Sequence, residues 1–182
     1  MKMPTKDECM DILKKEGVPE HIIRHSIMVA RVAVYLARKL KDAGEDVNVG
    51  LVESAALLHD VSKYNCIKNK SDVHHGEEGS TVLAKMGLKE IAEIVEKHGL
   101  DSIFDGSLKT LEEKLVYYAD KRVTHDKHVA LDERFDYLKK RYPMARERIV
   151  KAMPLVKKLE KDIFERIGET PELKGLKGAD AK

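Results

Sequence analysis

His59 and Asp60 stand side by side at the end of an apolar stretch, in the segment ALLHDVSKY of residues 56–64. A neutral imidazole and a carboxylate are both metal ligands, and neither is easily buried without a partner. The pair therefore predicts a metal site, provided that neighbouring elements supply further ligands.

Four more polar residues lie on apolar helical faces in the same way. His25, for example, follows Ile22 by three residues and precedes Val29 by four, which places its ring on a buried helical stripe. A single histidine of this kind is more often a hydrogen-bonded core residue than a ligand. Six such residues would need several independent polar pairings, whereas one shared metal site accounts for them together. The predicted ligands are His25, His59, Asp60, His75, His98 and Asp120.

The ligand types narrow the choice of metal. Imidazoles and carboxylates without a thiolate suit iron, manganese, cobalt and nickel as well as zinc. We therefore expect one or two divalent ions, drawn from iron, manganese, cobalt, nickel, magnesium and zinc. The sequence leaves their number and identity open.

The elements that carry these residues are all predicted to be helices. Apolar residues recur at spacings of three and four, and no segment shows the alternation of a strand. Residues 62–73 are expected to form a polar loop, and Pro154 to kink or split the last helix. The expected helices cover about 5–17, 19–43, 48–60, 76–86, 89–97, 110–123, 131–140 and 143–167.

Composition limits the partners and the compartment. Lys and Arg total 34 against 32 Asp and Glu, a net charge of +2, so composition alone gives no strongly basic face for nucleic acid. We expect a small phosphorylated partner, no nucleic acid and no membrane, with a homodimer left open. Cys9 and Cys66 form no CxxC pair, and the sequence shows no secretion signal or spanning segment, which favours the cytoplasm.

The ordered series of these residues resembles the H...HD...H...H...D pattern of the HD-superfamily metal-dependent phosphohydrolases. Local phrases agree: LLHDVSK resembles the family's apolar-HD-x-x-K phrase, HHGEEG its H-x-x-x-G helix start, and YYADK its closing A-D segment. Ser62 stands where the HDIG variant has glycine, which affects the loop more than the ligands. The signature of the cyclic-di-GMP-hydrolysing branch is missing, which argues against that substrate.

The resemblance implies a compact single-domain helical bundle of the HD-domain type. The expected division is an N-terminal helix packing on the domain (1–18), the HD domain (19–142), a C-terminal helical extension (143–168) and a mobile tail (169–182).

The resemblance also implies how the ligands are shared. His25, His59, Asp60 and Asp120 would bind one metal, and Asp60 would bridge to a second that His75 and His98 also hold. A mononuclear site that leaves His75 and His98 for phosphate binding or proton transfer stays open. Either arrangement implies an enzyme that cleaves a phosphate ester or anhydride of a nucleotide or other small metabolite, with attack by a metal-bound hydroxide.

Further residues near the ligands have weaker roles. Lys63, three residues after Asp60, could balance charge on the phosphate, and His74 could donate a proton to the leaving group. Each of these side chains could equally be a solvated surface group. The weaker phosphate candidates are Lys121, Arg122 and Arg24.

His125 and His128 stand at a spacing that suits one helical face, but they lie more than one turn beyond Asp120. A solvated or substrate-rim role fits them better than metal binding. Two other classes of function stay open for the chain. One is a non-catalytic regulator that binds metal or nucleotide in the same pocket, and the other is a helical scaffold.

Overall fold

The computed structural model describes residues 3–71 and 73–178, and it confirms the predicted all-α fold. Short 3₁₀ turns (η) and one hairpin connect the α-helices in this part of the chain. The helices are α1 (Lys6–Lys15), α2 (Glu20–Asp42), α3 (Val49–Leu58), α4 (Lys63–Asn69), α5 (His75–Lys85), α6 (Lys89–Glu96), α7 (Leu111–Asp120), α8 (Leu131–Arg141) and α9 (Arg146–Ile167). The connecting elements are η1 (Leu100–Ile103), β1 (Val123–Thr124), β2 (Lys127–His128), η2 (Pro143–Ala145) and η3 (Lys174–Gly178).

Local signals in the sequence define several helix ends. Thr5 with Glu8 and Thr110 with Glu113 form capping boxes at the starts of α1 and α7. In each box the threonine side chain and the glutamate side chain accept the backbone N–H of the other residue. Gly168 ends α9 with a φ of 64°, a conformation that glycine adopts without a Cβ clash.

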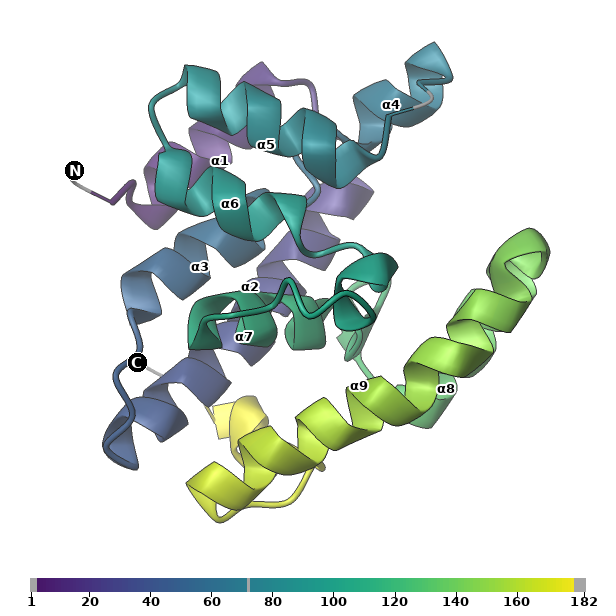
Figure 1. Ribbon diagram of the computed structural model, residues 1–182. Coiled ribbons are helices and arrows are strands. Elements are labelled where there is room, and N and C mark those ends of the chain that lie inside the picture. Colours follow the sequence, from purple (N-terminus) through teal and green to yellow (C-terminus); the bar gives the residue numbers. More distant parts are fainter. Residues whose placement is uncertain (1–2, 72, 179–182) are drawn as a thin grey trace.

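Helix α2 runs through the middle of the molecule (Figure 1) and packs against α3, α7 and α9. Its apolar stripe, which includes Val29, Leu36 and Leu40, is fully buried. Burying a side chain of this size favours folding by about 1.5–3 kcal/mol. Because α3 also contacts α6 and α7, the polar residues near the ends of these helices are brought into one region.

The segment after His59 and Asp60 is a helix and not the predicted polar loop. Helix α4 ends at Asn69 and is followed by Lys70, which has a φ of 50°. Its buried Cys66 donates to Glu78 of α5 over 2.8 Å, so a tertiary contact holds the helix in place. Seven residues with one buried position give too short a periodic pattern to recognise in the sequence. Residue 72, in the same predicted loop, lies outside the described residues.

A short hairpin follows α7, where the sequence predicted no strand. Strands β1 and β2 pair antiparallel with Thr124 opposite Lys127, which leaves His125 and Asp126 as the turn. His125 has a φ of 56° whereas Asp126 has no positive φ, which is the pattern of a type II′ turn. Two-residue strands are too short to show alternation, which explains the wrong prediction.

Pro154 lies inside α9, which continues from Arg146 to Ile167, so the helix is not split. The proline stands on the exposed side of the helix. There the carbonyl of Val150, which loses its usual N–H partner, can bind water instead.

The beginning of the predicted mobile tail packs on α2. Leu173 and Leu176 are buried in the core, and Glu169 accepts a hydrogen bond of 2.7 Å from Tyr35. The segment predicted as a mobile tail therefore buries side chains near its start, while residues 179–182 lie outside the described residues. The predicted division into domain parts stays a prediction.

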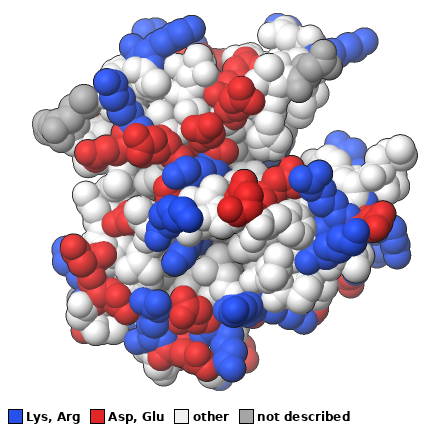
Figure 2. All heavy atoms as spheres, in the orientation of Figure 1, with Lys and Arg blue, Asp and Glu red and all other residues white. Residues whose placement is uncertain are grey.

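Charged side chains of both signs are spread over the face shown in Figure 2. Even the long helices α2 and α9 carry many of them along their lengths. Accordingly, none of the helices in the described ranges is both long and apolar enough to cross a bilayer.

Candidate metal centre

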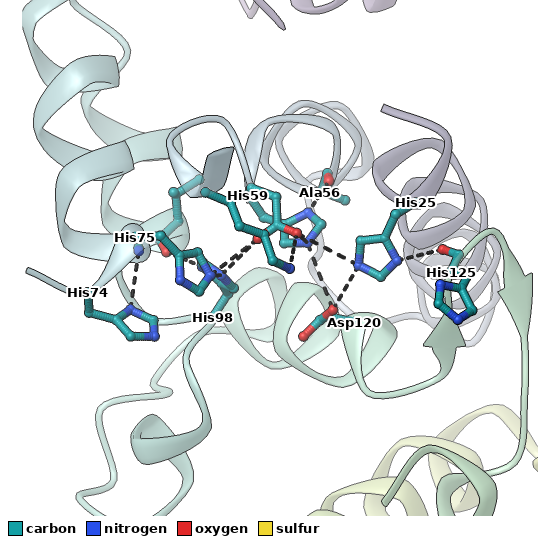
Figure 3. A network of polar contacts seen from close by, with 12 residues as sticks. His25, Ala56, His59, His74, His75, His98, Asp120 and His125 are labelled. Atoms are coloured by element: carbon teal, nitrogen blue, oxygen red, sulfur yellow. Dashed lines mark hydrogen bonds and ion pairs between the residues drawn. The ribbon is translucent and has the colours of Figure 1, made fainter. Parts of the chain in front are cut away.

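The six predicted ligands lie together where several helices meet (Figure 3). All of them except His25 stand at or just after a helix end, from which a side chain can reach over neighbouring elements. His25 comes from α2, His59 and Asp60 follow α3, His75 begins α5, His98 lies just beyond α6, and Asp120 ends α7. Tertiary packing thus gathers residues that are 95 positions apart in the sequence.

The first group contains His25, His59 and Asp120. The Nε2 atom of His25 lies 3.1 Å from Oδ1 of Asp120, and that of His59 lies 3.9 Å from the same oxygen. Oδ2 of Asp60 is 3.4 Å from Nε2 of His59 and 3.9 Å from Nε2 of His25. One ligand atom from each residue of the group lies within 4.8 Å of the others.

The second group contains Asp60, His75 and His98. The Nε2 atoms of the two histidines are 2.9 Å apart. Oδ1 of Asp60 lies 3.2 Å from Nε2 of His75 and 3.7 Å from Nε2 of His98. This group is open to solvent on one side, because His75 is half-buried whereas the other two are buried.

Asp60 connects the two groups, because Oδ2 faces the first and Oδ1 faces the second. Its side chain is 1% exposed, and Oδ2 accepts a 2.7 Å hydrogen bond from Lys63. Burial by itself raises the pKa of Asp60, but the charge of Lys63 and the contacts of His59 and His75 hold that pKa well below its ordinary value. A buried carboxylate with its two oxygens facing separate groups of ligands has the geometry to bridge two cations.

Hydrogen bonds to the backbone fix the tautomers of three histidines. In each case Nδ1–H donates to a carbonyl, so the neutral ring has a lone pair at Nε2. Burial lowers the pKa of His98 to about 4, which keeps that ring neutral. The bonds run from His25 to the carbonyl of His125 (2.8 Å), from His59 to that of Ala56 (2.7 Å) and from His98 to that of Val95 (2.5 Å).

Divalent cations fit this arrangement. The Nε2 lone pairs of His25 and His59 face carboxylate oxygens at 3.1–3.9 Å. The lone pairs and the oxygens repel each other unless a positive charge lies between them. Nε2 of His59 is buried and has no hydrogen-bond partner among the described residues. Two ligand atoms that each lie about 2.1 Å from one ion, with roughly a right angle between the two bonds, are ~3 Å apart. This is close to the distance between the Nε2 atoms of His75 and His98. Nδ1–H bonds to carbonyls also commonly orient imidazole ligands.

Two cations flank Asp120. Lys121 donates to its Oδ2 over 2.8 Å and to the carbonyl of His98 over 2.8 Å, and Nη2 of Arg134 lies 3.5 Å from its Oδ1. Burial raises the pKa of Asp120, yet Lys121, His25 and Arg134 together hold it well below its ordinary value. The phosphate candidate Lys121 is therefore beside the ligands, but it is buried and bound to them.

Arg134 was missed by the sequence analysis. It comes from α8, beyond all the predicted ligands, and its buried Nε has no hydrogen-bond partner among the described residues. Its guanidinium also lies 5.6 Å from the ring centre of Tyr137. The spacing of Leu131, Arg134 and Phe135 did offer a signal, because it places a cation on the buried face of a helix.

His74 lies at the outer edge of the second group, and its ring centre is 4.3 Å from that of His75. Its Nδ1 accepts from the N–H of Gly76 at the start of α5, which leaves a proton on Nε2 in the neutral ring. Burial and the neighbouring His75 lower its pKa. A hollow of about 450 Å³ lies beside both rings, with Cys66, Ile67 and Val73 in its wall.

The other two residues predicted to bind phosphate, Arg122 and Arg24, make their contacts away from the ligand groups. Arg122 is buried and donates to the carbonyls of Val129 and Pro171, both at 2.7 Å, and to Glu160 of α9. It therefore ties α7 to α9 and to the C-terminal segment. Arg24 is half-exposed and pairs with Asp126 of the hairpin turn at 3.6 Å.

The histidines of the hairpin do not join either ligand group. His125 serves through its backbone, because its carbonyl accepts from His25, and its ring packs on Tyr137 at 5.4 Å between centres. The positive φ of the turn is what aims this carbonyl at α2. His128 lies in β2, outside the two groups found among the described residues.

A larger cavity of about 570 Å³ lies elsewhere, against α1, α2 and α3, with Arg31, Tyr35 and Arg38 in its wall. None of the six predicted ligands lines it. The ligand chemistry belongs to the clustered histidines and aspartates, so cavity size does not locate the site.

Comparison with known proteins found relatives among curated sequences. Two proteins named tRNA (cytidine(56)-2'-O)-methyltransferase, from Thermoplasma volcanium and Picrophilus torridus, are each 31% identical, over 82% and 74% of this chain. An uncharacterized protein of Methanocaldococcus jannaschii is 29% identical over 74% of this chain and 85% of its own length. No solved structure matches the chain.

This chain spans 46% and 40% of the lengths of the two methyltransferases. More than half of each relative therefore lies outside the match. Their names nevertheless overturn the prediction that no nucleic acid takes part, because that prediction rested on overall composition alone.

The family comparison agrees with the residue pattern and the geometry. The HD domain family matches residues 22–124, a range that contains all six predicted ligands. This is a family of the metal-dependent hydrolase type, and the clustered histidines and aspartates could hold its metals. The chain belongs to the HD domain family.

Proposed function

We propose that this protein is a metal-dependent phosphohydrolase with a dinuclear centre. His25, His59 and Asp120 would hold one divalent cation, His75 and His98 the other, and Asp60 would bridge the two. The observation that carries this proposal is the orientation of Asp60, whose two carboxylate oxygens face the two groups. Cations bound in such a pair acidify water and neutralise charge on phosphoryl oxygens.

The chain's own residues supply the other requirements. Lys63 is charged, because Asp60 and Asp120 raise its pKa although burial opposes this. It would balance negative charge on a phosphoryl group beside Asp60. His74, which has its Nε2 proton free of the helix cap, would protonate the leaving group. The hollow beside His74 and His75 would admit the substrate.

The substrate class includes RNA as well as free nucleotides. Two relatives carry names that place their action on tRNA, which supports an RNA partner for this chain as well. Methyl transfer is not part of the proposal, because the ligand cluster suits phosphate chemistry and more than half of each relative lies outside this chain. A regulator that binds metal without turnover is the second candidate, supported by the deep burial of most ligands.

The test is release of phosphate or of a cleaved product after loading with each metal in turn. Protein stripped by a chelator would be reloaded with manganese, anaerobic iron, cobalt, nickel, magnesium or zinc. Substrates would include nucleotides, dinucleoside polyphosphates, cyclic nucleotides, phosphomonoesters and phosphorylated RNA ends. We expect chelator-sensitive turnover of one class; silence in fully metallated protein would support the regulator instead.

Asp60→Asn is the decisive variant. We expect it to lower turnover by at least 10³-fold and bound metal from two ions per chain to one or none. Asp11→Asn, a change at an exposed carboxylate of α1, is the matched control and should leave both unchanged. Full activity of folded Asp60→Asn protein would exclude the scheme. His75→Ala should leave one ion per chain, whereas a wild-type count of one would point to the mononuclear form.

A further inference from the structure

The tip formed by the end of α8, by η2 and by the start of α9 is unusually basic. We call residues 139–151 the basic arm; they contain six Lys or Arg side chains and one acidic residue, Glu147. The rest of the chain is slightly acidic, with 28 Lys or Arg against 31 Asp or Glu, although the whole molecule carries a net charge of +2. The hairpin of α8 and α9 projects from the body (Figure 1), and Lys and Arg side chains gather over it in Figure 2.

Half of these cations form no ion pair within the described residues. Lys139 pairs with Asp136, Lys151 with Glu147, and Arg148 with Asp101. In contrast, Lys140, Arg141 and Arg146 are exposed and pair with no carboxylate in the described part of the chain. Three unpaired cations on one projecting tip attract a polyanion by charge complementarity.

Exposed apolar side chains lie among the cations. Met144 is 98% exposed and Tyr142 is 48% exposed, with the guanidinium of Arg141 5.7 Å from the tyrosine ring centre. Phe104, after η1, is 41% exposed and lies beside Arg148 at 6.0 Å. Rings interleaved with cations form the kind of surface on which unpaired bases stack while their phosphates meet the charges.

The basic arm also adjoins the metal centre. The arm continues α8, the helix whose Arg134 lies with Nη2 3.5 Å from Oδ1 of Asp120. In Figure 2 the surface is indented between this arm and the part formed by α4 above it. A strand bound along the arm therefore passes close to the ligands.

We propose that the basic arm binds a single-stranded segment of RNA beside the metal centre. Lys140, Arg141 and Arg146 contact its phosphates, and Tyr142 and Phe104 stack on its bases. The proposed function includes RNA among the substrates of this chain. The choice of RNA as the partner of the arm rests on that proposed function. A membrane fits the tip less well, because the six cations of the arm outnumber its exposed large apolar side chains, which are Tyr142, Met144 and Val150.

Fluorescence anisotropy with a labelled, unstructured 20-nucleotide RNA tests this proposal on the full chain. Lys140→Ala/Arg141→Ala/Arg146→Ala should weaken binding at least tenfold. It should also reduce the slope of log K against log salt by about 2, since each phosphate contact on a single strand contributes about 0.7. Tyr142→Ala should weaken binding at least fivefold and leave that slope unchanged.

The matched control removes three exposed lysines outside the arm, as Lys15→Ala/Lys41→Ala/Lys85→Ala. It should bind RNA within twofold of wild type. Equal weakening by the two triple variants would overturn the proposal, because binding would then follow net charge alone. Retention of full RNA affinity by the arm variant, or stronger binding to phosphatidylserine vesicles than to RNA, would overturn it as well.

The same assay on Asp60→Asn separates this proposal from the proposed function. RNA binding by Asp60→Asn at wild-type affinity supports the arm as an independent surface, even if no substrate is ever hydrolysed. Turnover of a small phosphate ester by the wild-type protein supports the phosphohydrolase, even if RNA does not bind. Loss of RNA binding in folded Asp60→Asn protein would contradict the arm as the binding surface.

Discussion

Asp60 and Asp120 are both buried, but different groups compensate their charges. Asp60 pairs with Lys63, whereas Asp120 lies between Lys121 and Arg134. Such charges are stable in the core only when cations and hydrogen bonds surround them. Replacement of a flanking cation should therefore change the centre without removing a ligand.

At the scale of single residues, Arg134→Gln tests the cation that α8 contributes. We expect a loss of metal affinity or of turnover on the order of 10–100-fold, as is typical for a residue that orients a metal ligand. Arg134→Lys should recover part of the loss, because it restores the charge near Oδ1 of Asp120 but not the planar guanidinium.

Metal titration followed by calorimetry gives the affinity, and kcat and KM are measured on the same protein. Lys157→Gln, which removes a half-exposed cation of α9, serves as the control. Wild-type metal affinity and wild-type kinetics in Arg134→Gln would show that the guanidinium only fills space.

At the scale of elements, Glu113 joins two helices of the site. Its carboxylate caps α7 by accepting from the N–H groups of Lys109 and Thr110, and it pairs at 2.5 Å with Lys97, the residue that follows α6. Burial alone raises the pKa of Glu113, but Lys97 and the two N–H groups lower it below its ordinary value. The cap thus holds together the helices that carry His98 and Asp120.

Glu113→Gln should lower the free energy of unfolding by about 1–2 kcal/mol at neutral pH, in the range of a lost charged cap. Because the folded-state pKa is lowered, the ionised carboxylate stabilises the fold above its unfolded pKa of about 4.3. This contribution is lost as the pH falls through that value toward the folded-state pKa.

Urea unfolding at several pH values measures the effect. The difference between wild type and Glu113→Gln should shrink below about pH 4. Glu90→Gln, at an exposed first-turn position of α6, is the control. A difference that stayed constant down to low pH would mean that packing, and not charge, makes the contribution.

At the scale of the whole molecule, the centre joins α2, α3, α5, α6 and α7, so its occupancy should stabilise the entire fold. A free metal concentration of one hundred times Kd raises the free energy of unfolding by about 2.7 kcal/mol if only the folded state binds the metal. For a chain of this size the Tm should rise by roughly 5–10 °C. Scanning calorimetry of stripped and reloaded protein measures this shift.

Asp60→Asn should lose most of the metal-dependent rise in Tm, whereas Asp11→Asn should keep it. The Tm of Asp60→Asn with metal is compared with the Tm of the same variant without metal, because removing a buried charge changes the stability of the protein even without metal. An equal rise in both variants would mean that metal binds outside the predicted ligands.

The sequence by itself determined the helical class, the capping boxes and the six candidate ligands. These features are local: apolar spacing follows from helix geometry, and a histidine or aspartate on an apolar stripe is visible without the fold. Helix α4 and the hairpin escaped prediction, because the first depends on the contact of Cys66 with Glu78 and the second is too short for a pattern.

Only the tertiary structure decided how the ligands are grouped and what surrounds them. The two-sided position of Asp60, the carbonyl of His125 at His25 and the guanidinium of Arg134 at Asp120 join residues from separate elements. The same packing buried Arg122 against α9 and left the basic arm projecting. Distances between helices depend on how their faces pack against each other, and the spacing of residues within one helix does not contain that information.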